Sequence, residues 1–262
     1  MSDSPPPWAP PLLAVQFLTR VPVPGTAALS GEQVRVGLGR SLVWFPVVGG
    51  LVGLVTAAVV LGAGTWWPAW VAVLLALVVE ARLTGAFHED AVADTCDALG
   101  GGTTRARTLE IMKDSRVGSY GALGLVLAVG LRVALLTTLV ATAGAGLVVA
   151  GVVASAALGR LGAVTVMRLV PPADRPAGLS KDVGGRASGR TLTAASLLAV
   201  PFAVPLAVLD PVGLLVGLVG SALLLVWWGR VLVRRLGGQT GDCLGAAVYA
   251  VQLVVLLGVT AG

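Results

Sequence analysis

Charged side chains are scarce in this sequence of 262 residues: only 12% are Asp, Glu, Lys or Arg, and there is a single histidine. Hydrophobic residues make up 56% and the mean hydropathy is +0.92, which argues against an ordinary soluble protein. The apolar runs also lack the alternation of a membrane β-barrel, and in lipid every backbone polar group must pair internally. The composition therefore predicts an all-α, polytopic integral membrane protein.

Three further absences narrow the possibilities. Cys96 and Cys243 are the two cysteines, and they are not spaced as CxxC, so we expect reduced thiols without a disulfide. The glycine-rich stretch Gly100–Thr104 lacks the Lys-Ser or Lys-Thr ending of a P-loop, so the sequence does not indicate an NTPase. The start MSDSPPPWAPP lacks the apolar core and basic region of a cleavable signal peptide. We expect residues 1–11 to form a flexible, Pro-rich tail.

Apolar runs of about 20 residues recur along the chain, the length at which a helix crosses about 30 Å of hydrocarbon. They predict about seven transmembrane helices in a single membrane domain that covers residues 1–262. The predicted spans are 42–62, 66–87, 119–141, 147–169, 191–209, 212–229 and 244–261. Gly49-x-x-x-Gly53 and Gly213-x-x-x-Gly217 lie within these spans and favour close helix packing.

The basic residues test this topology. The loops near 63–65, 142–146 and 210–211 share one side of the membrane and contain no Lys or Arg. The N-terminal segment and the loops near 88–118, 170–190 and 230–243 share the other side. These segments contain Arg20, Arg35, Arg40, Arg105, Arg107, Lys113, Arg116, Arg175, Lys181, Arg186, Arg190, Arg230, Arg234 and Arg235. By the positive-inside rule this side is cytoplasmic, which predicts a multi-pass protein of the cell (inner) membrane with cytoplasmic active-site loops.

The acidic residues are concentrated between Phe87 and Gly121. Asp90, Asp94 and Asp97 lie at positions i, i+4 and i+7, so on a helix they share one face. Like charges at this spacing repel one another, and a chain that keeps them beside a membrane indicates a bound cation. Carboxylates are the usual ligands of Mg²⁺, which bridges phosphate oxygens. We therefore expect this face to hold Mg²⁺, with a solvated helix face as the alternative.

The residues around this face suggest phosphate chemistry. His88 can orient an aspartate, accept a proton or contact substrate, and an interfacial histidine without chemistry is the alternative. Lys113 and Arg116 can neutralise charge on a leaving phosphate. Gly118 and Gly121 lead into the next predicted span and let backbone N–H groups approach an anion. The alternative for this stretch is a charged loop that anchors that span.

Four segments resemble the cobalamin synthase family, and together they extend over almost the whole chain. They are Phe17–Pro24, His88–Asp97, Glu110–Gly121 and Gly238–Gly245. The sequence departs from the family pattern at Ala91 and Ala98, where the family usually has glycine. It departs again beyond Gly245, where the family tends to have glutamate and this chain has Tyr249 and Gln252.

The resemblance implies an adenosylcobinamide-GDP ribazoletransferase. A ribose hydroxyl of α-ribazole, or of its 5′-phosphate, attacks the diphosphate of adenosylcobinamide-GDP, GMP leaves, and adenosylcobalamin or its 5′-phosphate forms. The implied metal ligands for Mg²⁺ are Asp90, Asp94 and Asp97. The implied catalytic residues are His88, Asp90, Lys113 and Arg116. The implied substrate-binding residues are Arg20, Asp114, Ser115, Thr240 and Asp242.

Two rival functions are weighed against this one. A CDP-alcohol-type lipid phosphotransferase also places aspartates at helical spacing, but its Asp-Gly-x-x-Ala-Arg opening is absent at Asp90. A transporter places ionisable residues near the membrane midplane, and Glu80, Arg82, Arg132 and Arg160 lie within or beside apolar runs. Arg–Glu pairing between helices is the simpler account of these four.

The expected partners are the two substrates and the lipid bilayer. Although the pI is near 10.0, the basic residues are spread over several short segments, which disfavours a nucleic-acid partner. The sequence leaves open whether the chain forms a homo-oligomer.

Overall fold

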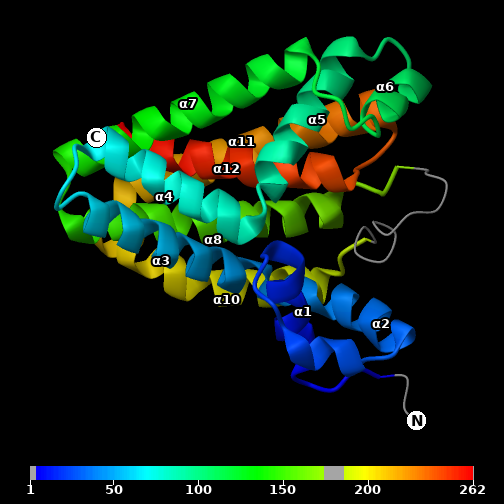
Figure 1. Ribbon diagram of the computed structural model, residues 1–262. Helices are drawn as coiled ribbons and strands as arrows, with labels where there is room; N and C mark the ends of the chain where they lie inside the picture. Colours follow the sequence, from blue (N-terminus) through cyan, green and yellow to red (C-terminus); the bar gives the residue numbers. More distant parts are fainter. Residues whose placement is uncertain (1–3, 174–185, 262) are drawn as a thin grey trace.

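Helices form nearly all of the described chain, which comprises residues 4–173 and 186–261 of a computed structural model (Figure 1). Arg175 and Lys181 of the predicted basic loop lie outside these residues. The α-helices are α1 (Ala9–Leu18), α2 (Gly31–Ser41), α3 (Phe45–Ala63), α4 (Ala69–Thr84), α5 (Phe87–Gly101), α6 (Arg105–Ile111), α7 (Ser119–Thr142), α8 (Ala145–Leu169), α10 (Gly189–Leu209), α11 (Pro211–Leu236) and α12 (Gly241–Thr260). Two short 3₁₀ helices, η1 (Pro24–Ala28) and η2 (Leu42–Trp44), lie before α2 and α3.

The predicted membrane architecture is confirmed. Six helical segments of the described chain are long and apolar enough to cross a membrane, or up to seven if the bent pair of α4 and α5 is one span. The predicted flexible tail is too long by a few residues, because α1 already begins at Ala9 and Ala9 is fully buried. Proline in the first turn of α1 costs no hydrogen bond, since the first N–H groups of a helix have no partner within it.

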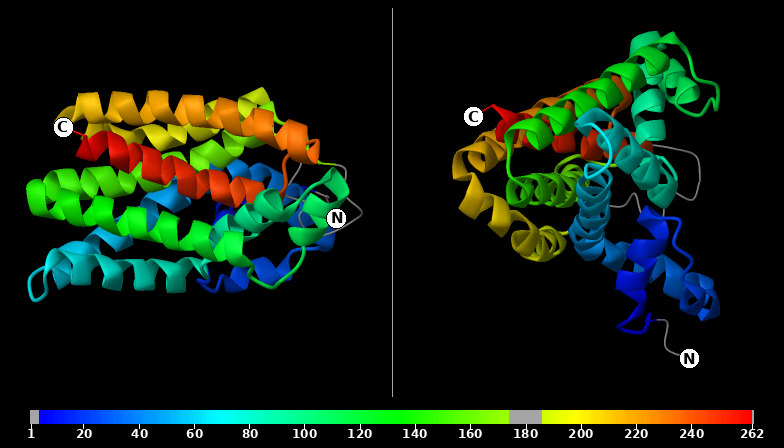
Figure 2. Two further views of the ribbon diagram at one scale, coloured as in Figure 1. Left: turned by 90° about the horizontal axis from the view of Figure 1, so that it is seen from above. Right: turned by 60° about the vertical axis from the view of Figure 1, so that its left-hand side comes forward.

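Helix α8 lies at the centre of the bundle and packs against α3, α10 and α12 (Figures 1 and 2). Small residues make this packing close. A Cβ atom at Gly49 would meet the carbonyl oxygen of Ala156 on α8, and one at Gly53 would meet the backbone of Val153. The expectation that the Gly49–Gly53 pattern serves helix packing is therefore confirmed.

The two ends of the bundle differ. One end has short connections at 64–68, 143–144 and 210, and Trp66, Trp67 and Trp70 are exposed there. Aromatic side chains at this position are typical of a membrane–water interface. The other end has α1, α2, α5 and α6 (Figure 1). The described parts of the loops predicted to share a side of the membrane thus lie at the same end of the molecule.

The predicted span 66–87 differs from the structure at its end. Helix α4 ends at Thr84, and the chain then turns by 89° into α5. Gly85 and Ala86 make the turn with left-handed φ angles of 74° and 55°. Glycine adopts this conformation readily, but alanine rarely does. Because of the turn, α5 lies across the end of the bundle instead of extending α4 (Figure 2).

Candidate active site

Helix α5 contains the three aspartates that the sequence places on one face. Asp90 is exposed, Asp94 is half-buried and Asp97 is buried. The helix packs against α12 and α7, and Gly245 of α12 lies directly against Ala91. A Cβ at Gly245 would meet the methyl group of Ala91, so glycine at this position lets α12 approach the acidic helix.

Asp94 lies in an acidic environment that includes a residue far away in sequence. Its pKa is raised to about 6, first because of burial and then because of the charges of Asp90, Asp242 and Asp97. Asp242 comes from the first turn of α12. The structure therefore places Asp242 close enough to Asp94 for its charge to act there. The substrate-binding role that the resemblance implies for Asp242 stays a prediction.

Asp97 is placed differently from its two neighbours. One carboxylate oxygen accepts a hydrogen bond from the backbone N–H of Gly118 at 2.6 Å, and the other accepts one from Gly121 at 2.8 Å. The sequence predicts that these glycines expose N–H groups to an anion, and in the structure that anion is Asp97. Each oxygen of Asp97 thus accepts one backbone hydrogen bond, which leaves fewer lone pairs for a metal ion. The predicted role of Asp97 as a metal ligand stays a prediction.

Residues 112–118 connect α6 to α7 and carry the predicted cations. Arg116 donates from Nε to Oδ1 of Asp114 at 2.9 Å and from Nη2 to Oδ2 at 2.6 Å. These bonds lower the pKa of the Asp114 carboxyl to about 2. Lys113, Ser115 and Arg116 are exposed. The connection thus presents basic side chains to solvent, with one of them paired to a carboxylate.

His88 does not lie with the aspartates. It is only 4% exposed, and a two-residue step on a helix rotates the side chain by about 200° relative to Asp90. Burial, followed by the charges of Arg160 and Arg132, holds the pKa of His88 well below its usual range, so the imidazole is neutral. His88 lines a cavity of about 60 Å³ with Arg160 and Phe17.

Two predicted substrate-binding residues have structural contacts. The backbone N–H of Arg20 donates to Leu83 at 2.7 Å, and its guanidinium lies over Gly85 at the turn between α4 and α5. Thr240 is buried at the N-terminus of α12, where its hydroxyl accepts from the N–H of Cys243 and contacts Met112. Both residues lie at the same end of the bundle as α5. Their predicted contacts with substrate stay predictions.

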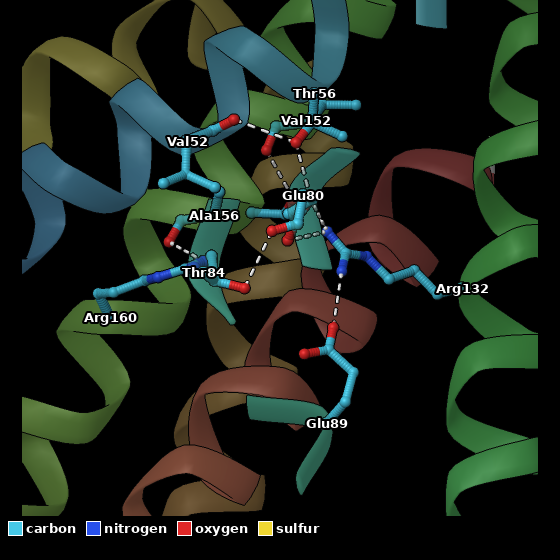
Figure 3. Close-up of polar contacts among 10 residues, drawn as sticks. Val52, Thr56, Glu80, Thr84, Glu89, Arg132, Val152, Ala156 and Arg160 are labelled. Carbon is cyan, nitrogen blue, oxygen red and sulfur yellow. Dashed lines mark hydrogen bonds and ion pairs between the residues drawn. The ribbon is translucent and has the colours of Figure 1, made fainter. Parts of the chain in front are cut away.

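A buried polar network lies deeper in the bundle (Figure 3). Arg132 of α7 donates to both carboxylate oxygens of Glu80 on α4, at 2.7 and 2.8 Å. Thr56 of α3 donates to Glu80 at 2.7 Å, and Glu89 of α5 lies 3.9 Å from Arg132. The expected Arg–Glu pairing between helices is confirmed for Arg132 and Glu80, whereas Arg82 is exposed on α4. Thr56 and Glu89 were not predicted to belong to this network. Both are polar residues within or beside an apolar run, and that position is the feature that could have indicated their role.

Arg160 is the other buried cation of this region. It is 1% exposed, and Nη1 donates to the carbonyl oxygen of Ala156 at 3.3 Å. Its Nε and Nη2 atoms have no hydrogen-bond partner among the described residues. The charge of Arg160 acts on both Glu80 and His88. The network therefore extends electrostatically from the bundle interior to the first turn of α5.

The carboxylate oxygens near Asp94 are of the kind that binds a hard divalent cation. Within the described residues, no three His, Cys, Asp or Glu side chains are arranged to hold a metal ion. Asp90, Asp94 and Asp242 nevertheless supply the carboxylate oxygens that Mg²⁺ prefers. Their mutual repulsion contributes to the raised pKa of Asp94, and a cation would relieve that repulsion. The chemistry of this donor set fits Mg²⁺.

Comparison with known proteins covers nearly the whole chain. The model of a family described as cobalamin-5-phosphate synthase matches residues 10–260. A protein of Bradyrhizobium diazoefficiens named adenosylcobinamide-GDP ribazoletransferase is 41% identical over 246 residues, which cover 94% of this chain and 90% of the relative. A protein of the same name from Leptothrix cholodnii is 40% identical, with 95% and 94% covered. No solved structure matches this chain.

Proposed function

Because the chain belongs to the cobalamin-5-phosphate synthase family, we propose that it is an adenosylcobinamide-GDP ribazoletransferase. The family match from residue 10 to residue 260 carries this proposal. A hydroxyl oxygen of α-ribazole, or of its 5′-phosphate, forms a bond to the cobinamide-linked phosphorus. The bond from that phosphorus to the oxygen of the GMP phosphate breaks, GMP leaves with the electron pair, and the hydroxyl proton passes to a base.

Asp90 and Asp94 of α5 and Asp242 of α12 are the residues that would hold Mg²⁺. The ion would neutralise the diphosphate and make its phosphorus a better electrophile. Two of these carboxylates come from α5 and one from the first turn of α12, and the charges of Asp90 and Asp242 both act on Asp94. Burial raises the pKa of Asp94 to about 6, and the repulsion of its acidic neighbours adds to that rise. The repulsion supports this assignment.

Lys113 and Arg116 would stabilise the negative charge that develops on the departing GMP phosphate. Both are exposed and lie on the connection between α6 and α7. Arg116 is held by Asp114 in the present structure, and an incoming phosphate would compete with that carboxylate for the same two nitrogen donors. Asp114 thus keeps the guanidinium ordered before substrate arrives.

An aspartate is a better candidate than His88 for the base that accepts the hydroxyl proton. His88 is neutral and so able to accept a proton, but it is buried on the opposite side of α5 from the acidic face. Asp90 and Asp94 reach the face where the diphosphate would bind. We assign His88 to the packing of α5, where its ring lies edge-to-face against Phe87.

The end of the bundle that contains α5 would face the cytoplasm. Arg20, Arg107, Lys113, Arg234 and Arg235 lie at this end, and the described connections at the other end contain no Lys or Arg. The positive-inside rule supports this orientation. The two rival functions are not favoured, since the family match extends over nearly the whole chain.

Purified protein in detergent provides the test. With adenosylcobinamide-GDP, α-ribazole and Mg²⁺, wild type is expected to release GMP in an amount equal to the corrinoid product. Asp90→Asn should abolish release while the protein still inserts and purifies as a folded species. Glu32→Gln, which changes an exposed acid on α2, should retain full activity. Absence of GMP release by wild type would refute the proposed function.

A further inference from the structure

A single carboxylate joins the acidic helix to the start of α7. Asp97 accepts from the N–H of Gly118 at 2.6 Å and from the N–H of Gly121 at 2.8 Å. Gly118 is the N-cap of α7 and Gly121 lies in its first turn. Within the described chain, α7 has no hydrogen-bonded N-cap side chain of its own and no acid in its first turn. Asp97 therefore does the work of an N-cap from a different helix.

A side chain at either glycine would clash with the Asp97 carboxylate. A Cβ atom at Gly118 would lie 2.5 Å from Oδ1 of Asp97. A Cβ at Gly121 would collide with the other oxygen of Asp97 and with the carbonyl of Ala93. Conformation does not explain glycine at position 118, because its φ is −91°, which any residue adopts. The absence of a side chain at these two positions therefore lets the Asp97 carboxylate approach the N-terminus of α7.

The electrostatics of this contact are favourable. The N-terminus of a helix carries a partial positive charge, and α7 has 24 residues. Asp97 is only 9% exposed, so little water competes for its oxygens. A charged oxygen that accepts a backbone N–H forms a stronger hydrogen bond than a neutral one. The negative charge of Asp97 therefore stabilises the N-terminus of α7 through these two hydrogen bonds.

The contact also fixes two parts of the proposed active site relative to each other. Asp97 lies on the same helix as Asp94 and less than one turn beyond it. Gly118 lies two residues after Arg116, at the end of the connection that carries Lys113. Holding Asp97 to Gly118 therefore holds the basic connection beside the carboxylates. Among the described residues, these two hydrogen bonds join the helix of the acidic face to the end of that connection.

From this geometry we propose that Asp97 is a positioning residue and not a ligand of Mg²⁺. It sets the position of the basic connection over the acidic face, while Asp90, Asp94 and Asp242 bind the cation. This inference rests on the proposed function of the same site. It differs from the ligand set that the sequence predicts, in which Asp97 is the third ligand.

The test compares variants that break the contact from either side. Asp97→Asn removes the charge, whereas Gly121→Ala keeps the carboxylate and displaces it. Asp94→Asn is the matched ligand variant. The measurements are kcat per folded molecule, the Mg²⁺ concentration for half-maximal rate, and the shift in Tm that Mg²⁺ produces without substrate. The last measurement reports binding and requires no turnover.

Asp97→Asn and Gly121→Ala are both expected to lower kcat by about 10- to 100-fold, in line with other positioning residues around a metal site. Half-saturation by Mg²⁺ and the Mg²⁺-induced Tm shift should change less than about twofold. In Asp94→Asn the Mg²⁺ concentration for half-maximal rate should rise at least about tenfold, and the Mg²⁺-induced Tm shift should become clearly smaller than in wild type. The double variant Asp97→Asn/Gly121→Ala should be no worse than either single one, because both remove the same contact.

Three results would overturn the inference. One is a loss of Mg²⁺ affinity in Asp97→Asn that equals the loss in Asp94→Asn. Another is a lower Tm with unchanged kcat per folded molecule, which would make the contact purely stabilising. The third is additive effects in the double variant. Should Gly121→Ala fail to fold, Gly118→Ala provides the second route. Absence of GMP release by wild type would instead refute the proposed function, and the Tm measurements would still decide the role of Asp97.

Discussion

Nη2 of Arg132 lies 2.7 Å from a carboxylate oxygen of Glu80 inside the helix bundle, and both side chains are about 95% shielded from solvent. The pair joins α4 to α7, and the ring of Tyr249 on α12 lies 5.4 Å from the same guanidinium. Buried charges of this kind persist where both partners are present, because each would otherwise be stranded in an apolar medium.

Removing one partner of this pair should destabilise the protein strongly. Glu80→Gln or Arg132→Met leaves a buried charge without its counterion, for which about 3–5 kcal/mol is typical. The double variant Glu80→Gln/Arg132→Met should be less destabilised than the sum of the single ones. Thermal unfolding in detergent measures this, with Arg82→Gln as the exposed control on α4. Additive losses in the double variant would contradict the prediction.

Stability should depend on pH through Asp94. Its pKa is about 6 in the folded protein, against 3.8 for an ordinary aspartate. Between these values the folded state binds more protons than the unfolded state, so the contribution of Asp94 to stability falls as pH rises from about 4 to about 6. Without Mg²⁺, Asp94→Asn is therefore expected to have a higher Tm than wild type at pH 7.5 and a similar Tm at pH 4. A lower Tm for the variant at pH 7.5 would contradict this.

Divalent cations should restore the stability that repulsion among the carboxylates removes at pH 7.5. Mg²⁺ would offset the repulsion among Asp90, Asp94 and Asp242, so it should raise the Tm of wild type at pH 7.5. The rise should shrink below pH 6, where protons occupy Asp94. Removal of the cation with EDTA should abolish both the rise and GMP release. An equal Tm rise in Asp242→Asn would show that this residue does not bind the ion.

Loss of Arg116 should reduce the rate of catalysis and leave the stability of the fold unchanged. Arg116→Gln removes a donor from the leaving phosphate and is expected to lower kcat by about 100-fold, the usual cost of one transition-state donor. Because Arg116 is exposed, its loss should leave Tm unchanged within error. Arg107→Gln is the matched control, an exposed arginine paired to Glu110 at 2.9 Å. Equal kcat values in the two variants would contradict the assignment.

Helix packing at α8 offers a test of the fold itself. A side chain at Gly49 would meet the backbone of Ala156 and the stem of Arg160, so Gly49→Val should destabilise by about 1–3 kcal/mol, as overpacking usually does. Gly62 is on the same helix, and no described atom lies within 4 Å of its added Cβ. Gly62→Ala should therefore be neutral or stabilising by up to about 1 kcal/mol. Thermal unfolding of the two variants decides between these outcomes.

Much of the architecture could be predicted from apolar runs and charge, because the bilayer imposes both length and sidedness on helices. The common face of Asp90, Asp94 and Asp97 followed from helical spacing alone. The turn before α5 could not be predicted in the same way. Gly85 is a common place for a helix to end, but Ala86 adopts a left-handed φ that its residue type disfavours. In the structure the N–H of Ala86 donates to the carbonyl oxygen of Ala81 at 2.8 Å, a bond that closes the end of α4.

The roles of individual residues were harder to predict than their positions. Asp94 and Asp97 are the same residue type on the same helix. They differ because the N–H groups of Gly118 and Gly121 at the start of α7 donate to Asp97. His88 is adjacent to the acidic face in sequence, yet it points into the protein. These differences depend on which helices pack against each side of α5. The spacing of residues along the sequence does not show which helices those are.

The contacts of α12 affect how the protein is made. This helix packs against α5, α7, α8 and α11, and it brings Asp242 to a helix that is synthesised about 140 residues earlier. A nascent chain still on the ribosome before Gly241 therefore contains α5 without Asp242 and without the helix α12 that packs against α5. If Asp242 binds Mg²⁺ as proposed, catalytic competence requires translation through α12, and prematurely terminated chains are expected to lack activity.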